Sequence, residues 1–228
     1  MSHRLFVTGT DTGVGKTEIS AAILHAANHR GLSTLGLKPV AAGCEYQQGE
    51  LVNEDALLLQ QHASLSLEYA LINPVRLVAA MAPHLAAEQQ GVRLQVSDLV
   101  KACEPGLGAG ADLTLVEGAG GWRVPLNEEE TLADLARVLH LPVILVIGMR
   151  LGCLNHALLT AEAIQADGLE LAGWVANAME PRMLCEDENF ETLQTMMPAP
   201  CLGRTHWING EHRTAALADQ LYLGPLSI

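Results

Sequence analysis

Residues 5–17 constrain the fold of this chain more than any other stretch. They read LFVTGTDTGVGKT, an apolar run that enters a glycine-rich turn and ends in Gly15-Lys16-Thr17, just before an Ala-rich segment of helical character. Glycines let backbone N–H groups curl around phosphate oxygens, a lysine neutralises the outer phosphates, and a threonine hydroxyl can bind magnesium. The positive end of the following helix would point at the anion. The stretch predicts a phosphate-binding loop between a strand and a helix.

The glycine spacing of this loop differs by one residue from the usual pattern G-x-x-x-x-G-K-[ST]. Thr10 stands where the first glycine is expected, and Gly9 comes one place earlier. A glycine-rich turn that ends in Lys-Thr by chance is the alternative, and the strand, loop and helix context argues against it. We therefore interpret the stretch as a variant phosphate-binding loop.

The length and net charge of the chain limit the number of domains and the kinds of partner that it can have. The 228 residues suit one domain with a large core, so we expect residues 1–228 to form a single unit. A formal charge of −13 without a basic cluster argues against partners such as nucleic acid or an anionic membrane surface. Lysine is scarce, because the 13 basic residues include only Lys16, Lys38 and Lys101. Lys16 and Lys38 are therefore candidates for the local cations that a phosphate ligand requires.

Nothing in the sequence predicts export or membrane insertion. The first strand follows Met-Ser-His-Arg at once, which leaves no room for a signal peptide, and no apolar run approaches the ~18 residues that span a bilayer. The five cysteines lack C-x-x-C spacing, and their odd number provides no disulfide framework. We therefore expect a cytoplasmic protein.

Buried strands and helices alternate along the chain. We expect strands at residues 5–9, 34–40, 112–117, 142–148 and 171–177, with shorter extended pieces at 71–78 and 201–207. Expected helices cover residues 18–28, 53–62, 83–90, 97–103 (capped by Ser97), 132–139, 154–167, 187–196 and 212–222, with a flexible connection at 106–110. This alternation predicts an α/β fold like that of phosphate-binding-loop NTPases, with a doubly wound, mostly parallel sheet and helices on both faces.

Polar residues collect where the predicted strands end. In open α/β sheets, ligands bind at the carboxyl ends of the strands. These ends carry the phosphate loop, Lys38, Glu117 with the glycine-rich bend 118–121, the segment 148–155 and Asn177. We expect the ligand site at this edge of the sheet.

Each of these polar residues also has an alternative interpretation. Glu117 follows a buried strand, where an acidic residue can bind magnesium directly or through water, or can simply end the strand in solvent. We expect Lys38 to stabilise charge on a transferring phosphoryl group. The alternative is a lysine at the end of a strand whose ammonium extends into solvent and has no catalytic role. Asp55 lies in the first turn of a predicted helix, and its spacing leaves two roles open: it could bind a metal, or it could only complement the helix dipole. Asn177 could contact a base or ribose, or cap its strand.

The histidines and tryptophans receive no ligand role. His25 and His29 have the i, i+4 spacing of a helical metal pair, but no Glu follows His25 and no third ligand is evident. We expect Trp122, Trp174 and Trp207 to contribute packing rather than to stack on a ligand.

Seven segments in a specific order point to one family. They are residues 7–17, 38–40, 53–57, 116–122, 141–146, 151–157 and 173–177. Each is weak alone, and together they resemble the dethiobiotin synthetase family over nearly the whole chain. The resemblance implies an ATP-dependent cyclo-ligase, a homodimer with Mg²⁺ as cofactor, that converts 7,8-diaminononanoate and CO₂ (or bicarbonate) to dethiobiotin in biotin biosynthesis. One amine would form an N-carbamate, ATP would phosphorylate it to a carbamic-phosphoric anhydride, and the second amine would close the ring, releasing ADP and phosphate.

The resemblance also implies site residues, position by position. Lys16 and Lys38 would be catalytic, and Thr17, Asp55 and Glu117 would bind magnesium. Nucleotide contacts would come from Gly13, Val14, Gly15, Lys16, Thr17, Asp55, Glu117, Gly118, Ala119, Gly120, Asn177, Ala178, His206, Trp207 and Ile208. Substrate contacts would come from Thr12, Lys38, Ala42, Gly152, Cys153, Leu154 and Asn155, of which the last four would receive the carboxylate of substrate bound mainly to the other subunit.

Three positions depart from the family pattern. Gly13 stands where an acidic residue is frequent, Ala42 where a hydroxyl often contacts the substrate, and His206 where proline is common. The lost hydrogen bond at Ala42 is worth about 0.5–1.5 kcal/mol and leaves a paralogous ligase for another substrate as an alternative. A non-biosynthetic dimeric ATPase switch is a second alternative, although such proteins usually carry a lysine where Asp11 stands.

We expect neither Lys16 nor Lys38 to be needed in the core.

Overall fold

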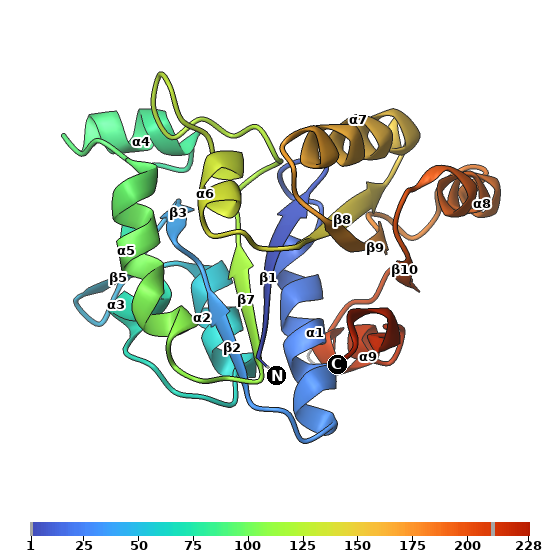
Figure 1. Cartoon of the computed structure of the whole chain (residues 1–228), viewed down its shortest axis with the longest axis horizontal. Helices are drawn as coiled ribbons and strands as arrows, with labels where there is room; N and C mark the ends of the chain where they lie inside the picture. The colour runs from blue at the N-terminus through green and yellow to red at the C-terminus, as the bar shows by residue number, and fades with distance from the viewer. Residues whose placement is uncertain (1, 211–212) are drawn as a thin grey trace.

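A six-stranded sheet in the order β10-β9-β8-β1-β7-β2 forms the centre of the computed structural model, which describes residues 2–210 and 213–228 (Figure 1). All pairings between these strands are parallel. The doubly wound sheet predicted from the alternation of strands and helices is confirmed. The strands are β1 (His3–Gly9), β2 (Thr34–Leu37), β7 (Leu113–Glu117), β8 (Val143–Met149), β9 (Leu171–Ala178) and β10 (Cys201–Thr205).

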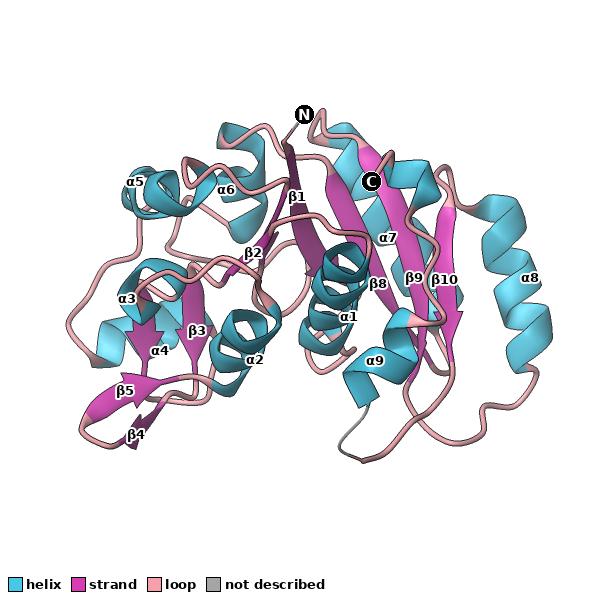
Figure 2. Cartoon of the chain, turned by 90° about the horizontal axis from the view of Figure 1, so that it is seen from below, coloured by secondary structure: helices cyan, strands magenta, loops and turns pink. Residues whose placement is uncertain are grey.

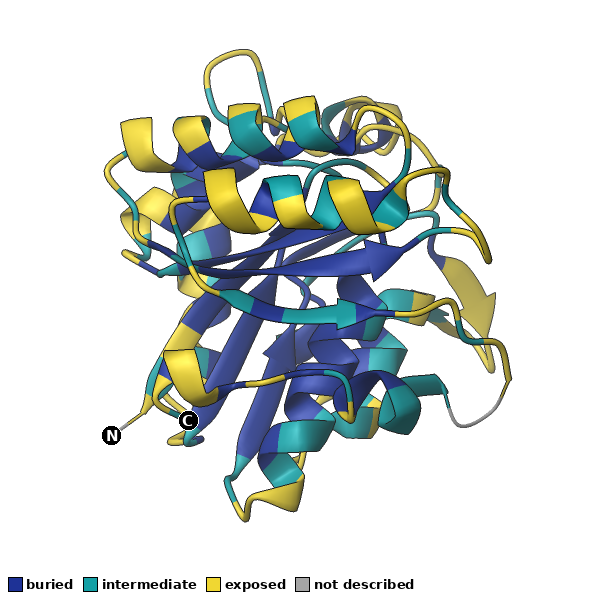
Figure 3. Ribbon diagram, turned by 90° about the vertical axis from the view of Figure 1, so that its right-hand side faces the viewer, coloured by how far each residue is buried: buried dark blue, intermediate teal, exposed yellow. Residues whose placement is uncertain are grey.

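Helices cover both faces of this sheet (Figures 2 and 3). Side chains alternate along a strand, so Phe6 joins one buried cluster while Leu5 and Val7 join the other. The described residues include no helix with the length and apolarity that a bilayer crossing requires. One face carries α1 (Lys16–His29), α2 (Glu54–His62) and α9 (Arg213–Ala218), and the other carries α5 (Val96–Leu107), α6 (Leu132–Val138), α7 (Cys153–Ala166) and α8 (Glu186–Met196).

A smaller group of elements lies beyond the β2 edge of the sheet (Figure 2). Strands β3 (Val40–Ala42) and β6 (Val75–Leu77) pair in parallel, and β4 (Glu45–Gln47) and β5 (Glu50–Val52) form an antiparallel hairpin that the sequence analysis did not predict. Short helices complete the chain: α3 (Tyr69–Ile72) and α4 (Pro83–Gln89) here, and the 3₁₀ turn η1 (Gly224–Leu226) at the C-terminus. The extended piece expected at 71–78 is therefore wrong at its start, which is helical, and is limited to β6.

The strand predicted at residues 34–40 is wrong beyond Leu37. Pro39 has no N–H to give to a strand ladder, so the chain leaves the sheet at this point. The N–H of Lys38 donates instead to the carbonyl of Ile72 at 2.8 Å, and Val40 begins β3 in the separate two-stranded sheet. This break sets the Lys38 side chain at the carboxyl end of β2.

The predicted start and end of helix α5 also differ from the structure. Ser97 does not cap it, because the helix begins one residue earlier, at Val96, whose N–H donates to the Glu130 carboxylate at 3.1 Å. The helix continues through Pro105 to Leu107 instead of stopping at residue 103. A cap supplied from a distant segment has no local sequence signal.

The last helix is shorter than predicted. Its expected first residue, His212, lies outside the described residues, and α9 ends at Ala218 rather than at Tyr222. The reason is a competing contact, because the N–H of Tyr222 donates to the carbonyl of Leu202 at 2.7 Å beside β10. The chain therefore leaves the helix to pair with the sheet edge.

Helix α6 shows how local sequence sets a helix start. The carboxylate of Asp134 accepts both the N–H and the hydroxyl of Thr131 at 2.8 Å, and it also accepts the guanidinium of Arg137 at 2.9 Å. Partial burial works to raise the pKa of Asp134, but these hydrogen bonds outweigh burial and hold that pKa below its ordinary value.

The variant Asp134→Ala is expected to lose about 1 kcal/mol of unfolding free energy at pH 7, because the helix loses its capping box. The folded pKa of Asp134 is depressed, so this contribution is present above the unfolded pKa of about 3.9 and is lost as pH falls through the folded value. Urea unfolding from pH 7 downward measures the difference. Asp98→Ala is the control, because its pair with Lys101 is exposed and worth little. A difference that does not shrink toward acid pH would contradict this role.

Candidate active site

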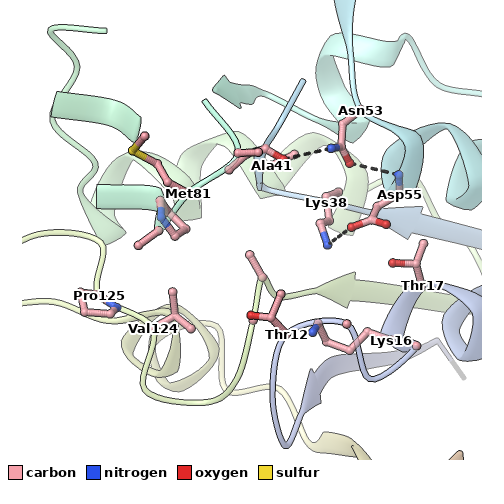
Figure 4. A pocket seen from close by; sticks show the side chains of 18 of the residues that line it. Thr12, Lys16, Thr17, Lys38, Ala41, Asn53, Asp55, Met81, Val124 and Pro125 are labelled. Carbon is pink, nitrogen blue, oxygen red and sulfur yellow. Dashed lines mark hydrogen bonds and ion pairs between the residues drawn. The ribbon is translucent and has the colours of Figure 1, made fainter. Parts of the chain in front are cut away.

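A pocket of about 800 Å³ opens at the carboxyl ends of the central strands (Figure 4). The phosphate loop and the start of α1 form its floor, and Lys38 and the start of α2 form one side. The segment 80–83 and the bend after β7 form the other side. Of the residues predicted from the sequence, the pocket is lined by Thr12, Gly13, Gly15, Lys16, Thr17, Lys38, Ala42, Asp55, Ala119 and Gly120.

The phosphate loop depends on glycine at the position where helix α1 begins. Gly15 has φ of 84°, a left-handed conformation, and a Cβ there would lie only 2.2 Å from Nδ2 of Asn177. The loop therefore passes too close to β9 for any side chain. This close approach leaves the start of α1, with its free N–H groups, facing the pocket.

Strands β9 and β10 support this loop from beneath. The side chain of Val14 is buried in the core, and its carbonyl accepts Nδ2 of Asn177 at 2.8 Å. The hydroxyl of Thr205 donates to Oδ1 of Asn177 at 2.6 Å. Asn177 and the neighbouring Ala178 are buried and do not line the pocket. An amide has two N–H donors and two acceptor positions, so these two contacts leave one donor and one acceptor position of Asn177 without a partner among the described residues.

A cluster of charges lies where four elements meet. The ammonium of Lys38 donates to Oε1 of Glu117 at 2.6 Å and to the carbonyl of Gly118 at 3.0 Å, and it lies 2.9 Å from Oδ2 of Asp55. The hydroxyl of Thr17 donates to the same Oε1 of Glu117 at 2.8 Å. Glu117 is 0% exposed and Lys38 is 2% exposed. The structure thus brings together residues from β2, β7, α1 and α2 that the sequence separates.

The two lysines of this cluster respond differently to burial. Burial lowers the pKa of Lys16 to about 8, and the Lys38 ammonium adds to this effect. Burial also works against the charge on Lys38, but the carboxylates of Glu117 and Asp55 outweigh it and hold the pKa of Lys38 above its ordinary value. Burial works to raise the pKa of Asp55, and Lys38 keeps it below its ordinary value. Among the described residues, the ammonium of Lys16 donates to the carbonyl of Asp11 alone, at 3.2 Å.

The burial of both lysines argues against the expectation that neither is needed in the core. Lys38 and Lys16 are both buried, and Lys38 is the direct counter-charge of a fully buried carboxylate. Removing one partner of a buried ion pair costs about 3–5 kcal/mol, because the other charge stays buried and unpaired. Truncation of Lys38 is therefore expected to reduce the stability of the protein.

The residues present fit a magnesium ion. Oε2 of Glu117 is buried and has no hydrogen-bond partner in the part of the chain that the structure describes, although buried carboxylate oxygens are normally paired. Asp55 and Thr17 add a carboxylate and a hydroxyl oxygen beside it. No group of three or more His, Cys, Asp or Glu side chains in the described part of the chain is arranged to hold a metal by itself. One or two carboxylates that share the ion with phosphates and water are what Mg²⁺ usually receives from a protein.

Two groups of predicted site residues lie away from this pocket. Gly152, Cys153, Leu154 and Asn155 form the start of α7 and do not line it. The segment His206, Trp207 and Ile208 follows β10 and does not line it either; Trp207 is 38% exposed, with the guanidinium of Arg213 5.9 Å from its ring centroid.

The sequence analysis missed the apolar side of the pocket, which consists of Met81, Pro83, Val124 and Pro125 (Figure 4). Met81 lies in a weakly patterned segment that carries no sequence signal. Arg123 also lines the pocket and forms an ion pair of 2.9 Å with Asp167, and its place just after the glycine-rich bend could have identified it.

The arrangement can bind a polyphosphate and bring a second anion to it. The phosphate loop and Lys16 form the floor of the pocket, Lys38 and Asp55 line one side with Glu117 buried against Lys38, and an apolar wall completes the pocket. Cations fixed in a site of low dielectric stabilise charge on a transferring group more strongly than water does. This site is therefore suited to phosphoryl transfer to an anionic acceptor.

Known sequences match nearly the whole chain. A family model described as "AAA domain" matches residues 3–211. A Pseudomonas aeruginosa (strain UCBPP-PA14) protein named "ATP-dependent dethiobiotin synthetase BioD" is 56% identical over 223 residues, which cover 98% of this chain and 97% of that protein. The protein of the same name from Cellvibrio japonicus (strain Ueda107) is 58% identical over 198 residues, 87% of this chain and 86% of that protein.

Solved structures share the fold at low sequence identity. The signal recognition particle receptor FtsY from Elizabethkingia anophelis, in complex with GDP, matches with a TM-score of 0.59 and 14% identity, covering 99% of this chain but only 62% of that one. The MinC:MinD cell division protein complex of Aquifex aeolicus matches with a TM-score of 0.57 and 15% identity, covering 95% and 86%. At these identities the likeness shows the fold alone, which is that of phosphate-binding-loop NTPases.

The variant Gly15→Ala is expected to lose at least about tenfold in affinity for nucleoside triphosphate, because its Cβ collides with Asn177 and displaces the phosphate loop. Gly168→Ala is the matched control: Gly168 also has a left-handed φ, of 77°, but nothing lies within 4 Å of its Cβ position. Both variants are expected to lose about 1 kcal/mol of stability from backbone strain. Calorimetric titration with ATP and thermal melting measure the two effects. Unchanged ATP affinity in Gly15→Ala would contradict the role of this close approach.

Proposed function

The chain belongs to the AAA-domain family and, within it, to the ATP-dependent dethiobiotin synthetases, and from this premise we propose how its own residues perform the reaction. The protein is a ligase of biotin biosynthesis that uses ATP to form dethiobiotin. Its substrates are 7,8-diaminononanoate, CO₂ and ATP. The observation that carries the mechanism is the cluster that the buried Lys16 and Lys38 form with the carboxylates of Asp55 and Glu117 beside the phosphate loop.

The chemistry explains why such a floor is needed. One amine of the substrate adds to CO₂ and loses a proton, which gives a carbamate anion. A carbamate oxygen then attacks the γ-phosphorus of ATP, and ADP leaves. The second amine attacks the carbonyl carbon of the resulting anhydride, and phosphate leaves as the cyclic urea forms. The phosphorylation step joins two anions, so clustered cations lower its barrier most.

We assign these cations as follows. Lys16, with the N–H groups of residues 13–17, neutralises the outer phosphates of ATP. Lys38 stabilises the carbamate and the moving phosphoryl group. Thr17, Asp55 and Glu117 would hold Mg²⁺, as the unpartnered Oε2 of Glu117 supports. When bound, Mg²⁺ neutralises charge that develops on the phosphate oxygens.

We assign the remaining contacts of the substrate and the nucleotide to residues that line the pocket and to residues outside it. Thr12 and Ala42 lie beside the reacting amines, and the wall of Met81, Val124 and Pro125 is suited to the methylene chain of the substrate. Gly118, Ala119 and Gly120 lie beside the phosphates. Adenine contacts would come from the free donor and acceptor of Asn177, with Ala178 and the segment His206, Trp207 and Ile208 after β10.

We further propose that the protein is a homodimer. Leu151 is 96% exposed just before α7, and Leu159 on that helix is 56% exposed, so both offer apolar surface to a second copy at this end of the molecule. The start of α7, at Gly152, Cys153, Leu154 and Asn155, does not line the pocket of its own subunit and would receive the substrate carboxylate of the second copy. In each subunit residues 1–228 would act as one domain, in the cytoplasm, where ATP is available.

Release of phosphate from ATP is expected to require 7,8-diaminononanoate, with a product heavier by one carbonyl and lighter by two hydrogens. Lys16→Ala is expected to lower kcat/KM at least about 100-fold, because a phosphate-neutralising charge is lost. Lys101→Ala, which removes an exposed lysine, is the control and should stay within about twofold of wild type. Phosphate release and product mass are measured together.

Two results would contradict this function. ATP hydrolysis that is indifferent to the diamine would favour an ATPase switch. Turnover with a different diamine, and none with 7,8-diaminononanoate, would favour a paralogous ligase and direct attention to Ala42.

The variant Leu151→Asp is expected to weaken the dimer at least about tenfold and to lower turnover, because a charge enters an apolar contact beside the carboxylate-receiving turn. Leu184→Asp is the matched control, since Leu184 is also highly exposed, at 89%, but lies before α8. Sedimentation velocity over a range of concentrations measures the dimer. A monomeric wild type, or an intact dimer in Leu151→Asp, would overturn the proposed interface.

A further inference from the structure

The ammonium of Lys38 fills the position between the two carboxylates that we assign to magnesium. It lies 2.6 Å from Oε1 of Glu117 and 2.9 Å from Oδ2 of Asp55, and it donates to the carbonyl of Gly118 at 3.0 Å. An ammonium has three N–H donors, so all three of them are used within the protein. In this arrangement Lys38 has no donor left for a carbamate or a phosphate.

The local charge is already balanced without a metal. Asp55 and Glu117 contribute two negative charges, and Lys16 and Lys38 contribute two positive ones. Both lysines and Glu117 are buried, so water screens these charges weakly. A divalent ion added to this cluster would meet the Lys38 ammonium at contact distance, and no further anion of the cluster would compensate it. The carboxylate pair can therefore hold the lysine or the metal, unless a ligand brings its own negative charge.

The backbone of Lys38 is fixed, so any displacement of its ammonium requires rotation of the side chain. Its backbone N–H is bound by the carbonyl of Ile72 at 2.8 Å, and its carbonyl accepts Nδ2 of the buried Asn73 at 2.7 Å. The side chain itself has four methylene groups and also lines the open pocket. Rotation of this side chain would carry the ammonium from the carboxylates into the pocket while the backbone stays in place.

We propose that Lys38 occupies the metal site of the free enzyme, so that magnesium enters only together with the nucleotide. The inference rests on the proposed function, whose magnesium ligands it uses. The phosphates of the nucleotide bring the negative charge that lets the carboxylates exchange the ammonium for the divalent ion. The released Lys38 then faces the pocket, where the carbamate forms. The enzyme thus withholds its carbamate-stabilising cation until the phosphoryl donor is bound.

Binding of Mn²⁺ to the full-length protein without nucleotide tests this exchange. Electron paramagnetic resonance measures the free ion. Wild type is expected to bind Mn²⁺ weakly, and Lys38→Met to bind it at least about tenfold more tightly, because the competing ammonium is gone. Lys16→Met is the matched comparison: it removes an equal buried charge that touches neither carboxylate, so we expect a gain below about threefold. Lys101→Met should leave Mn²⁺ binding unchanged.

Thermal melting provides a second readout that does not depend on turnover. Lys38→Met leaves Glu117 without its counter-charge, so we expect its Tm to fall without metal and to recover with Mn²⁺, while the same Mn²⁺ concentration leaves the Tm of wild type unchanged. If Lys38→Met does not fold without metal, refolding in its presence gives the same answer. Lys38→Gln repeats the test with a neutral side chain of similar length.

The outcomes separate this inference from the reaction itself. Equal Mn²⁺ affinity, or an equal Tm shift, in wild type and Lys38→Met would overturn the exchange and leave the ligase intact. Mn²⁺ that binds no variant, even with ATP, would overturn the exchange together with the magnesium site. Diamine-dependent phosphate release is measured independently, and its absence would instead reject the proposed reaction.

Discussion

The buried ion pair between Lys38 and Glu117 is the contact on which the rest of the site depends. It joins the end of β2 to the end of β7, and Thr17 and Asp55 attach α1 and α2 to the same point. Burying two opposite charges is costly, and the cost is offset only where the geometry is close and the other donors and acceptors find partners. Lys38 meets this condition with three acceptors, whereas Oε2 of Glu117 does not. The protein therefore keeps one unsatisfied buried oxygen at its active site.

The same balance of charge explains how an acidic protein can bind anionic substrates. The chain carries a formal charge of −13, and yet the cluster beside its phosphate loop is locally neutral because two of its three lysines are placed there. In the proposed function, a small number of fixed cations and backbone N–H groups would hold the nucleotide instead of a basic surface. The charged groups of such a site are coupled, because an ion that binds there changes the electrostatic energy of every other charged group in the cluster.

Support for the phosphate loop comes from strands that follow it late in the chain. Asn177 on β9 binds the carbonyl of Val14, and Thr205 on β10 orients Asn177. The absence of a side chain at Gly15 allows this close approach. The edge of the sheet therefore performs two tasks at once, because the contacts that hold the loop in shape also complete the packing of the last two strands.

The sequence by itself determined the strands of the central sheet, most helices and the phosphate loop, because alternation, capping and the Gly-Lys-Thr spacing are local patterns. It misplaced the end of β2 and the cap of α5, where Pro39 and the distant Glu130 decide. Only the tertiary structure decided that Lys38 meets Glu117, 79 residues away, and that Met81 faces the pocket. The physical reason is the order of the sheet, which places β2 beside β7, since contacts across strands depend on that order and not on nearby residues.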